Sequence, residues 1–392
     1  MRIAIVVPHF FPTFGGHEFY LARELARLGN DVHVITSDFL PSRYFPRPTK
    51  APPGDSRTDE GFELHRTRTF TDIHNMPTFD PRRTIHRIVP DIIYAQEYYQ
   101  LCSLLSFMAA KEMRAPFVFA QHMYEPPRGP LRVAWKGASM TMGAYVAGGA
   151  ARVVAISRAA RALLLSLGIP PEKIAVVPLG VDTAEFGFAE AGEGAKRKLG
   201  LAGRTVILYV GRLDPVKGMD VLLRAFASVS KTRPETVLVI KGTGTLGPSL
   251  MELSKRLGIS DSTKFISDWP RADLPELYAA CDVFVLPSVR EAFGLVGLEA
   301  MSTGRAVVAS RVGGIQDFVV PGETGLLARP GDPVALADAL AAVLDDDELR
   351  RRMGRRGREL AEKEFSYLSV AQKTLSVFRQ AVDSGGRGGA PL

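Results

Sequence analysis

Two glutamates, Glu291 and Glu299, stand eight positions apart in a segment that follows an apolar, β-branched run and opens a helical pattern. If Glu291 lies in the loop and Glu299 in the helix, a little over two helical turns separate them, and both can face one elongated ligand. Carboxylate oxygens accept strong hydrogen bonds from hydroxyl groups, such as those of a sugar. For the pair alone, however, helix capping and a solvated carboxylate are the stronger interpretation.

The turn Val210–Gly218, at the end of another apolar run, carries the complementary charge. Gly211 and Gly218 permit close approach of a ligand to the backbone, and Arg212 and Lys217 supply two cations that can neutralise a diphosphate. Without Mg²⁺ these cations would have to stabilise a departing diphosphate by themselves. Basic residues at surface turns are also common, so this turn alone decides nothing.

Two further glycine loops, Lys241–Gly244 and Gly313–Gly314, follow apolar runs in the same half of the chain, the second before an expected helix. Several strand ends with such loops describe a nucleotide pocket better than unrelated turns do. This setting reverses the interpretation of Glu291 and Glu299, which we now expect to bind a ligand.

In the first half, Gly15 and Gly16 stand where the first strand gives way to a helix, and free N–H groups there can meet an anion or a sugar. The Gly-x-Gly-x-x-Gly run of a dinucleotide site is absent from this first strand-to-helix turn, which argues against a nicotinamide enzyme. His122 follows an expected strand, and its imidazole can bond a sugar hydroxyl, although a lone histidine is usually structural. Ser157 is most simply a helix N-cap.

Short β-branched runs alternate with segments of helical period, so the fold class is α/β with parallel strands. The length of 392 residues predicts two domains. The strands expected in the first half are Arg2–Val7, Asp31–Thr36, Asp91–Tyr94, Phe117–Ala120, Arg152–Ile156 and Ile174–Val177. Those expected in the second half are Thr205–Val210, Thr236–Lys241, Lys264–Ile266, Val283–Leu286, Ala306–Ala309 and Gly325–Ala328.

The glycine-rich segment Asp182–Gly203 lies between the two sets of strands and has the composition of a connector, so we expect the hinge there. Two open parallel sheets in tandem predict a crevice between them, with ligands beyond the carboxyl ends of the strands. Residues 40–60 suggest a long surface loop, and a last helix over Ser366–Val382 precedes a Gly-rich tail that we expect to be disordered.

The net charge of +7 favours anionic partners, a nucleotide diphosphate, a lipid phosphate or a membrane surface, although solvation of the surface explains much of it equally well. Cys102 and Cys281 lie in apolar runs and fit reduced buried thiols, which indicates a cytoplasmic protein. The run Ile3–Val7 is too short for a secretory signal, and the best candidate span, Met140–Ala151, is too short to cross a bilayer.

Three basic stretches either meet anionic lipid, giving a peripheral position on the inner face of the membrane, or are solvated faces. They are Arg82–Arg87, Arg128–Lys136 and Arg350–Arg358. We expect no nucleic-acid partner.

Taken in chain order, these segments resemble the retaining glycosyltransferases of family 4, the glycosyl transferases group 1, which share the GT-B architecture of two Rossmann-like domains. The resemblance covers nearly the whole chain, and its specific parts are the Glu-x7-Glu segment with Phe293–Gly294 and the Arg212/Lys217 pair. The matching segments are Gly15–Glu18, Leu21–Asn30, Ala155–Ser157, Val177–Asp182, Gly211–Leu213, Lys217–Gly218, Glu291–Glu299 and Gly313–Gly314.

The resemblance implies a hexosyltransferase-type enzyme that moves a sugar from a nucleotide diphosphate, a UDP- or GDP-sugar, to a hydroxyl of a glycan, lipid-linked or small-molecule acceptor. Its retaining mechanism lets the leaving phosphate oxygen help deprotonate the acceptor, so no metal site and no cofactor are implied. The catalytic residues implied are Glu291, His122, Arg212 and Lys217. The donor-binding residues implied are Gly15, Gly16, Gly211, Arg212, Lys217, Gly242, Glu291, Phe293, Gly294, Leu295 and Glu299.

By the same resemblance, Arg212 and Lys217 would hold the diphosphate, Glu299 the ribose and Glu291 the transferred sugar, with His122 near the reacting centre. Residues 1–183 would form the acceptor domain, to which a helix over 365–382 returns, and 200–364 the donor domain, with 383–392 as the disordered tail. Gln96–Tyr98 stands where many family members carry a histidine, near the expected acceptor side.

Other functions remain open. A GT-B phosphorylase would carry a lysine-bound pyridoxal group and absorb visible light, and a sugar-nucleotide epimerase would convert donor with no acceptor present. From a different class, the chain would be a noncatalytic sugar-nucleotide or lipid-binding partner of another transferase.

Overall fold

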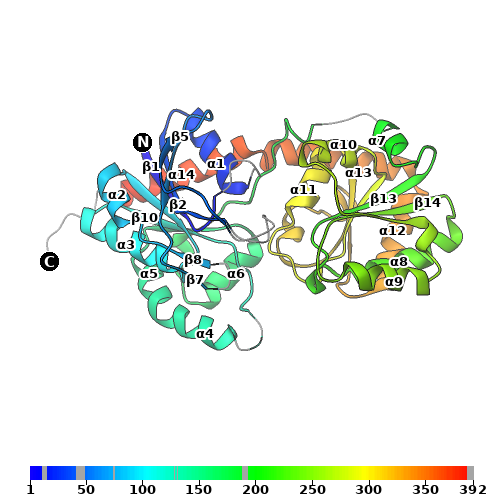
Figure 1. Ribbon diagram of the computed structural model, residues 1–392, viewed down its shortest axis with the longest axis horizontal. Helices are drawn as coiled ribbons and strands as arrows, with labels where there is room; N and C mark the ends of the chain where they lie inside the picture. The colour runs from blue at the N-terminus through cyan, green and yellow to red at the C-terminus, as the bar shows by residue number, and fades with distance from the viewer. Residues whose placement is uncertain are drawn as a thin grey trace. The chain divides into compact units, whose positions relative to one another are not determined.

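The computed structural model describes residues 1–10, 16–40, 49–73, 76–127, 129, 131–187 and 193–385. The chain forms two compact units (Figure 1). Unit 1 comprises Met1–Pro178 together with the segment that begins at Tyr367, and unit 2 comprises Leu179–Ser366.

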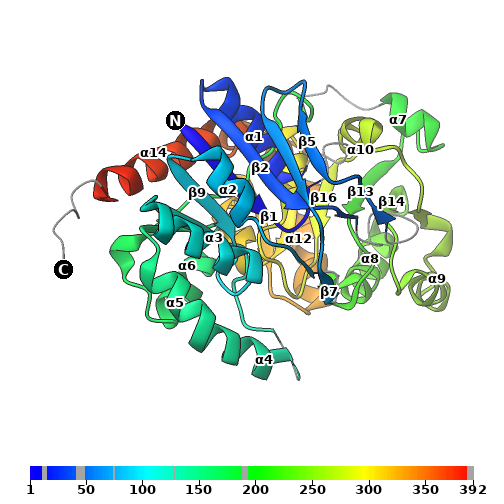
Figure 2. The ribbon, with the colours of Figure 1, turned by 60° about the vertical axis from the view of Figure 1, so that its left-hand side comes forward.

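Unit 1 is built on an eight-stranded sheet in which all strands are parallel except the edge strand β5. In sheet order the strands are β12 (Ile174–Val176), β11 (Arg152–Ala155), β10 (Phe117–Gln121), β9 (Ile92–Gln96), β1 (Arg2–Val7), β2 (Asp31–Ser37), β6 (Glu63–Thr67) and β5 (Gly54–Arg57). The chain order reverses between β1 and β9, which Figure 2 shows side by side.

The helices of unit 1 are α1 (His17–Arg27), α2 (Arg82–Ile88), α3 (Leu101–Met113), α4 (Leu131–Ala138), α5 (Ala144–Gly149), α6 (Arg158–Ser166) and α14 (Tyr367–Gly385). Of these, α1, α3, α6 and α14 pack against strands of this sheet. Helix α14 returns to lie beside α1 (Figure 2), where Tyr367 stacks on Tyr20 with ring centroids 4.6 Å apart. A π-helical turn over Ser139–Gly143 joins α4 to α5. Two small hairpins pair β3 (Phe39–Leu40) with β4 (Thr49–Lys50) and β7 (Thr71–Ile73) with β8 (Met76–Thr78).

Unit 2 has a wholly parallel sheet in the doubly wound order 3-2-1-4-5-6, with its reversal between β13 and β16. In sheet order the strands are β15 (Thr263–Ile266), β14 (Thr236–Lys241), β13 (Thr205–Val210), β16 (Val283–Leu286), β17 (Ala306–Ser310) and β18 (Gly325–Ala328). Because these strands are covered on both faces, their residues form nearly continuous apolar runs.

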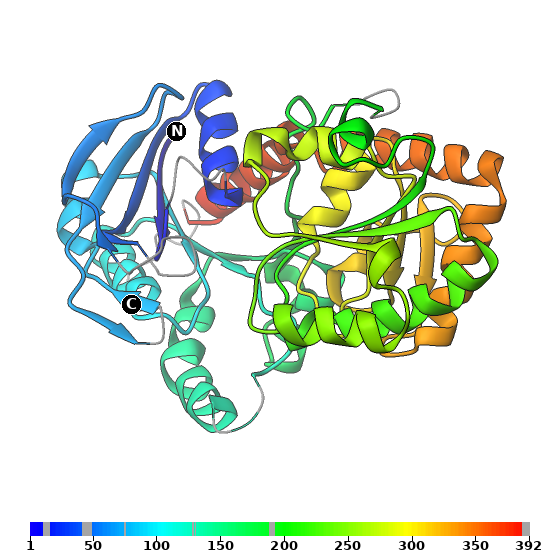
Figure 3. The same cartoon turned by 45° about the vertical axis from the view of Figure 1, so that its right-hand side comes forward.

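Helices lie on both faces of the unit 2 sheet (Figure 3), with α8, α9 and α12 on one face and α11 and α13 on the other (Figure 1). The helices are α7 (Glu193–Lys198), α8 (Met219–Thr232), α9 (Gly247–Arg256), α10 (Leu274–Ala279), α11 (Leu295–Ser302), α12 (Pro333–Asp345) and α13 (Asp347–Glu364). The α/β fold class and both sets of predicted strands are confirmed.

The expected hinge over Asp182–Gly203 is corrected, because this segment belongs to unit 2. Phe186 is buried there, and its carbonyl accepts hydrogen bonds from Ser302 Oγ at 2.7 Å and from the Arg358 guanidinium at 3.0 Å. The division of the chain falls before it, between Pro178 and Leu179.

Three smaller expectations also change. The surface loop over 40–60 contains β4 and β5 in its described part, and β5 pairs antiparallel with β6. The last helix continues to Gly385, so the first three residues of the expected tail are helical, and 386–392 lie outside the described residues. Ser157 caps α6 as predicted, accepting the N–H of Ala160 at 3.0 Å.

Cys102 and Cys281 are buried free thiols, as expected. Among the helices described, none combines the length and apolar character that crossing a bilayer requires.

Candidate active site

The loops that follow β13 and β14 cross each other at glycines. The N–H of Gly211 donates to Lys241 O at 3.0 Å, and a Cβ on Gly242 would lie 1.8 Å from Gly211 O. Gly242 also has a φ of +157°, which other residues rarely adopt. The close packing of the two loops therefore requires glycine at position 242. Gly211 and Gly242, both expected in the donor site, lie side by side.

Lys217 and Glu291 meet where the order of the unit 2 sheet reverses. Lys217 Nζ lies 2.6 Å from Glu291 Oε2, and Ser288 Oγ donates to the same oxygen at 3.1 Å. The Lys217 and Glu291 side chains are only 17% and 13% exposed. Lys217 ends a 3-10 turn after β13, whereas Glu291 follows β16, so the ion pair joins the two strand ends at the switch point.

Gly218 allows the two loops to approach this closely. Its φ is +64°, and a Cβ there would lie 2.2 Å from Pro287 O. As predicted, the turn leads directly into a helix, because α8 begins at Met219.

Gly313 and Gly314 support the Glu291 loop from the other side. A Cβ on Gly313 would lie 1.7 Å from Glu291 O, and the N–H of Gly314 donates to Ala292 O at 3.1 Å. The helix expected after this pair is corrected to a single 3-10 turn, Gly313–Asp317. The glycine pair thus acts by close packing, a function that the sequence alone did not distinguish from anion binding.

The residues from Phe293 onward divide between core and surface. Phe293 is buried and packs against Phe318 and Phe365, with ring centroids 5.8 and 6.3 Å away, so its ring fixes the segment in the core and does not face a ligand. Gly294 has a φ of +98° and precedes α11, whose first residue, Leu295, is partly exposed.

Glu299 lies in α11, as expected, with a partner that sequence reasoning missed. Tyr278 Oη donates to Glu299 Oε2 at 2.5 Å. Burial raises the pKa of the Glu299 carboxyl, and this hydrogen bond opposes the effect. Arg212 is largely exposed, and its guanidinium lies 2.7 Å from Asp214 Oδ2, a second unforeseen partner.

Unit 1 places two imidazoles together beyond the carboxyl ends of its strands. His17, the first residue of α1, lies with its ring 6.2 Å from that of His122 and 5.7 Å from that of Tyr367. Burial lowers the pKa of His17 to about 4 and also lowers that of His122. Gly16 directly precedes α1, whereas Gly15 lies outside the described residues.

Glu97 fixes the position of the His122 loop. Its Oε1 accepts the N–H groups of His122 and Met123 at 3.0 and 3.2 Å, and Glu97 itself has a φ of +57°, a sparsely populated conformation for a residue with a side chain. Burial raises the pKa of its carboxyl to about 7. Glu97 directly follows β9, the strand at which the unit 1 sheet reverses.

A cavity of about 840 Å³ lies in unit 1 between Tyr98 and the α4–α5 segment. Its wall is mainly apolar, with Arg132 and Lys136 as the charged groups. The lining residues are Tyr98, Pro126, Arg132, Val133, Trp135, Lys136, Ser139, Met140, Gly143, Ala144, Ala147, Leu167 and Ile169.

Comparison with known proteins accounts for both units. The family model described as Glycosyltransferase Family 4 matches residues 17–185, and the model described as Glycosyl transferases group 1 matches residues 193–360. A D-inositol 3-phosphate glycosyltransferase of Kineococcus radiotolerans is 34% identical over 315 residues, which are 74% of this chain and 72% of that protein. The chain belongs to glycosyltransferase family 4, the glycosyl transferases group 1.

Other members of the family align over less of their length. A D-inositol 3-phosphate glycosyltransferase of Corynebacterium efficiens is 40% identical over 230 residues, 56% of this chain and 54% of that protein, so the chain spans about half the length of such curated relatives. The structure of Anabaena HepE in complex with UDP has a TM-score of 0.78 at 23% identity, covering 97% of this chain and 100% of that one. This likeness confirms the GT-B fold of the family 4 chain.

We predict that Gly218→Ala destabilises this family 4 chain by more than backbone strain alone. The new Cβ clashes with Pro287 O and forces apart the loops that carry Lys217 and Glu291. Gly200→Ala is the matched control, because Gly200 has a similar φ of +68° and no atom within 4 Å of an added Cβ. The control should lose about 1–2 kcal/mol, the cost of a left-handed residue, and Gly218→Ala clearly more in thermal unfolding. Equal losses would contradict this account.

We predict that Glu97→Gln becomes more stable than the wild type as the pH rises. The folded-state pKa of about 7 exceeds the ordinary 4.5, so stability from the protonated carboxyl is present below pH 4.5 and is lost as the pH rises through 7. Glutamine keeps the acceptor oxygen without this titration. Calorimetric unfolding from about pH 5 to about pH 8 should show a gap growing in favour of the variant, to about 3 kcal/mol at most.

The exposed residue Glu172 in unit 1 provides the control for this pH series. Glu172→Gln should follow the wild type at every pH. A constant gap between Glu97→Gln and the wild type would show that Glu97 does not titrate in this range.

Proposed function

We propose that this chain is an enzyme that transfers a sugar from a nucleotide-diphosphate sugar to an acceptor hydroxyl, with retention at the anomeric carbon. The observation that carries the proposal is the Lys217–Glu291 pair at the switch point of unit 2, the position where doubly wound sheets bind their ligands. Its largely buried charges lie between loops that glycines allow to pack closely together.

Within unit 2, the groups match the parts of such a donor. Lys217 and Arg212 would neutralise the diphosphate, because a compact ammonium and a forked guanidinium both donate to phosphate oxygens. Glu291 would accept hydrogen bonds from hydroxyls of the transferred sugar, and Glu299 from the ribose. Because these cations can stabilise the charge of the diphosphate, we propose that the reaction needs no metal ion.

Unit 1 would supply two imidazoles that bind hydroxyl groups without removing the proton of the acceptor hydroxyl. His17 Nδ1 and His122 Nε2 are buried and lack a hydrogen-bond partner within the described part of the chain. Both rings are neutral near pH 7, because burial lowers their pKa values. We assign to them hydroxyl groups of the sugar or the acceptor.

In the proposed step, the bond from the anomeric carbon to the leaving phosphate oxygen breaks as the acceptor oxygen bonds to the same face. The acceptor proton passes to the leaving phosphate oxygen, so the products are the glycoside and the nucleoside diphosphate. Lys217 and Arg212 would stabilise the charge that develops on the diphosphate.

Relatives guide the choice of substrates to test. HepE binds UDP, and the two relatives named above are D-inositol 3-phosphate glycosyltransferases, so we propose a UDP-sugar as donor, with a GDP-sugar as the alternative, and a phosphorylated polyol as the first acceptor to assay. A thermal-shift panel of UDP, GDP, ADP and dTDP sugars identifies the donor, because a ligand of the native state raises stability by mass action.

We predict that Lys217→Met and Glu291→Gln each reduce sugar transfer at least about 100-fold. The first removes a cation that stabilises charge on the leaving diphosphate, and the second removes a hydrogen-bond acceptor that positions the transferred sugar. Transfer is measured as nucleoside diphosphate released with the acceptor present. The control is Lys196→Met, which removes another partly buried ion pair of unit 2, with Asp282 at 3.1 Å.

Lys196→Met should lose stability and keep its turnover. Wild-type turnover in both site variants would refute the proposed roles. Conversion of the donor without any acceptor would show an epimerase instead.

The cavity of unit 1 favours a second acceptor class, a lipid-linked hydroxyl. Val133 and Met140 are 77% and 69% exposed beside it, and Arg132 and Lys136 stand among them. Apolar side chains flanked by cations suit an acyl or polyprenyl chain at an anionic surface. We propose that this face gives a peripheral position at the inner face of the membrane.

We predict that the protein floats with anionic vesicles and that Val133→Ser with Met140→Ser abolishes this. The control is Met251→Ser, because Met251 is an exposed apolar residue of unit 2, 47% exposed. Failure of the wild type to float would contradict the membrane proposal, and only water-soluble acceptors would then be assayed.

A further inference from the structure

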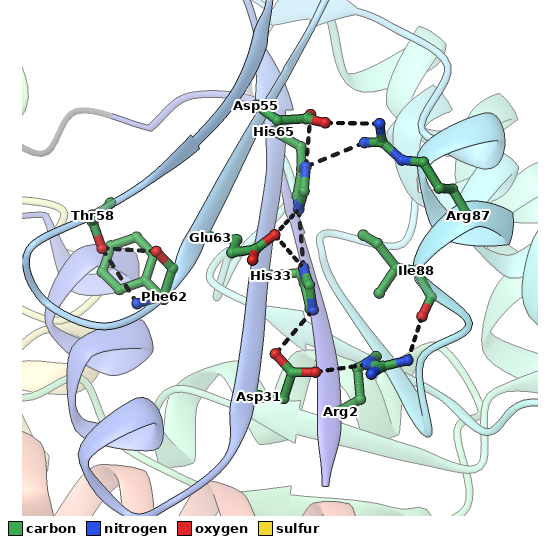
Figure 4. A network of polar contacts seen from close by, with 10 residues as sticks. All are labelled: Arg2, Asp31, His33, Asp55, Thr58, Phe62, Glu63, His65, Arg87 and Ile88. Atoms are coloured by element: carbon green, nitrogen blue, oxygen red, sulfur yellow. Dashed lines mark hydrogen bonds and ion pairs between the residues drawn. The ribbon is translucent and has the colours of Figure 1, made fainter.

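Three atoms that commonly bind metals converge on one face of the unit 1 sheet (Figure 4). His33 Nδ1 lies 3.0 Å from His65 Nε2, and Glu63 Oε2 lies 3.5 and 3.8 Å from these two nitrogens. The register explains the convergence, because His33 of β2 pairs with Glu63 of β6, and His65 is two residues further along β6. Residues two apart on a strand share a face.

The other nitrogen of each imidazole faces a carboxylate. His65 Nδ1 lies 2.8 Å from Asp55 Oδ1, and His33 Nε2 lies 3.1 Å from Asp31 Oδ1 (Figure 4). A carboxylate only accepts hydrogen bonds, so both contacts favour a proton on the outer nitrogen. The Arg87 guanidinium, 3.4 Å from His65 Nδ1, is a competing donor at that ring, and the His33 contact is an ion-pair distance without hydrogen-bond geometry.

With both protons on the outer nitrogens, the inner nitrogens present two lone pairs to each other, with the Glu63 carboxylate beside them. Three acceptors that face one point repel each other unless a cation lies among them. The histidines are 8% and 4% exposed, so water has little access to relieve this repulsion.

The outer carboxylates are themselves fixed by arginines. Arg2 Nε lies 2.7 Å from Asp31 Oδ2, and an Arg87 guanidinium nitrogen lies 2.7 Å from Asp55 Oδ2. Metal-binding histidines are typically oriented in this way, by a carboxylate on the nitrogen opposite the metal.

The spacing also fits an ion. Four ligands at about 2.0–2.1 Å around tetrahedral zinc are about 3.3 Å from one another. The three observed separations of 3.0, 3.5 and 3.8 Å bracket that value. The Glu63 side chain is 44% exposed, which leaves the fourth position open to water.

We propose that His33, Glu63 and His65 bind one divalent ion of the zinc class. Two imidazoles and one carboxylate are a ligand set that suits this ion. The ion would fasten β6, and through Asp55 the edge strand β5, to β2. Its place in the first half of β2, away from the strand's carboxyl end, separates it from the proposed transfer reaction.

The test is titration of the chelator-treated full-length protein with Zn²⁺ by calorimetry, together with Co²⁺ as a spectroscopic probe. We expect one equivalent to bind, a higher thermal unfolding midpoint, and visible Co²⁺ bands typical of tetrahedral nitrogen and oxygen ligands. Glu63→Gln and His65→Gln should lose this binding. Asp55→Asn should weaken it about 10–100-fold, the usual effect of removing an outer partner.

The control is His86→Gln, which removes another histidine of unit 1, whose Nε2 lies 2.8 Å from Glu112 Oε2 on the surface. It should bind zinc as the wild type does. If His65→Gln fails to fold, the half-exposed Glu63→Gln variant decides. Absence of saturable binding at one equivalent, or wild-type affinity in Glu63→Gln, would overturn the proposal and leave a proton shared between the imidazoles.

Discussion

Lys217 and Glu291 form a 2.6 Å ion pair between the loops that follow β13 and β16. These are the neighbouring strands between which the strand order of the unit 2 sheet reverses. Both side chains are largely withdrawn from water, so each charge depends on the other for compensation. The surrounding backbone is shaped around this contact. Gly218 approaches Pro287, and Gly313 approaches Glu291, at distances that exclude any side chain. The contact therefore fixes two opposite charges at the place in unit 2 where we propose that the donor binds.

The sheet of unit 1 also reverses its strand order at one point, but different residues lie there. Glu97 follows β9, the strand that corresponds in order to β16, and its carboxylate is held by the N–H groups of His122 and Met123, with no ammonium partner among the contacts described. Burial raises the pKa of this carboxyl to about 7, although the two N–H groups oppose the effect. The imidazoles of His17 and His122 lie together in the same unit. One unit thus presents paired charges at its switch point, and the other presents neutral hydrogen-bonding groups.

The sequence predicted what is encoded by local pattern. Buried parallel strands are apolar runs ended by glycine or proline, so β1, β13, β14, β16 and β18 were located to the residue. Strand β5 was missed because Gly54–Arg57 is exposed and polar, without alternation. The tertiary contacts had no local signal: the Tyr278–Glu299 hydrogen bond and the His33–His65 cluster join residues distant in the chain. The sequence also did not mark the positive φ of Glu97. The burial of the Phe293 ring was not foreseen either, because a buried ring and an exposed ring look the same in a sequence.

The most direct test distinguishes the role of Lys217 from that of Glu291. Calorimetry measures how tightly a nucleoside diphosphate and its sugar conjugate bind to a variant of each residue. If Lys217 holds the diphosphate and Glu291 the sugar, Lys217→Met weakens the binding of both ligands by the same factor. Glu291→Gln then weakens only the sugar nucleotide, since the free diphosphate offers it no hydroxyl of a transferred sugar. An equal loss for both ligands in Glu291→Gln, or undiminished binding in Lys217→Met, would contradict the assignment.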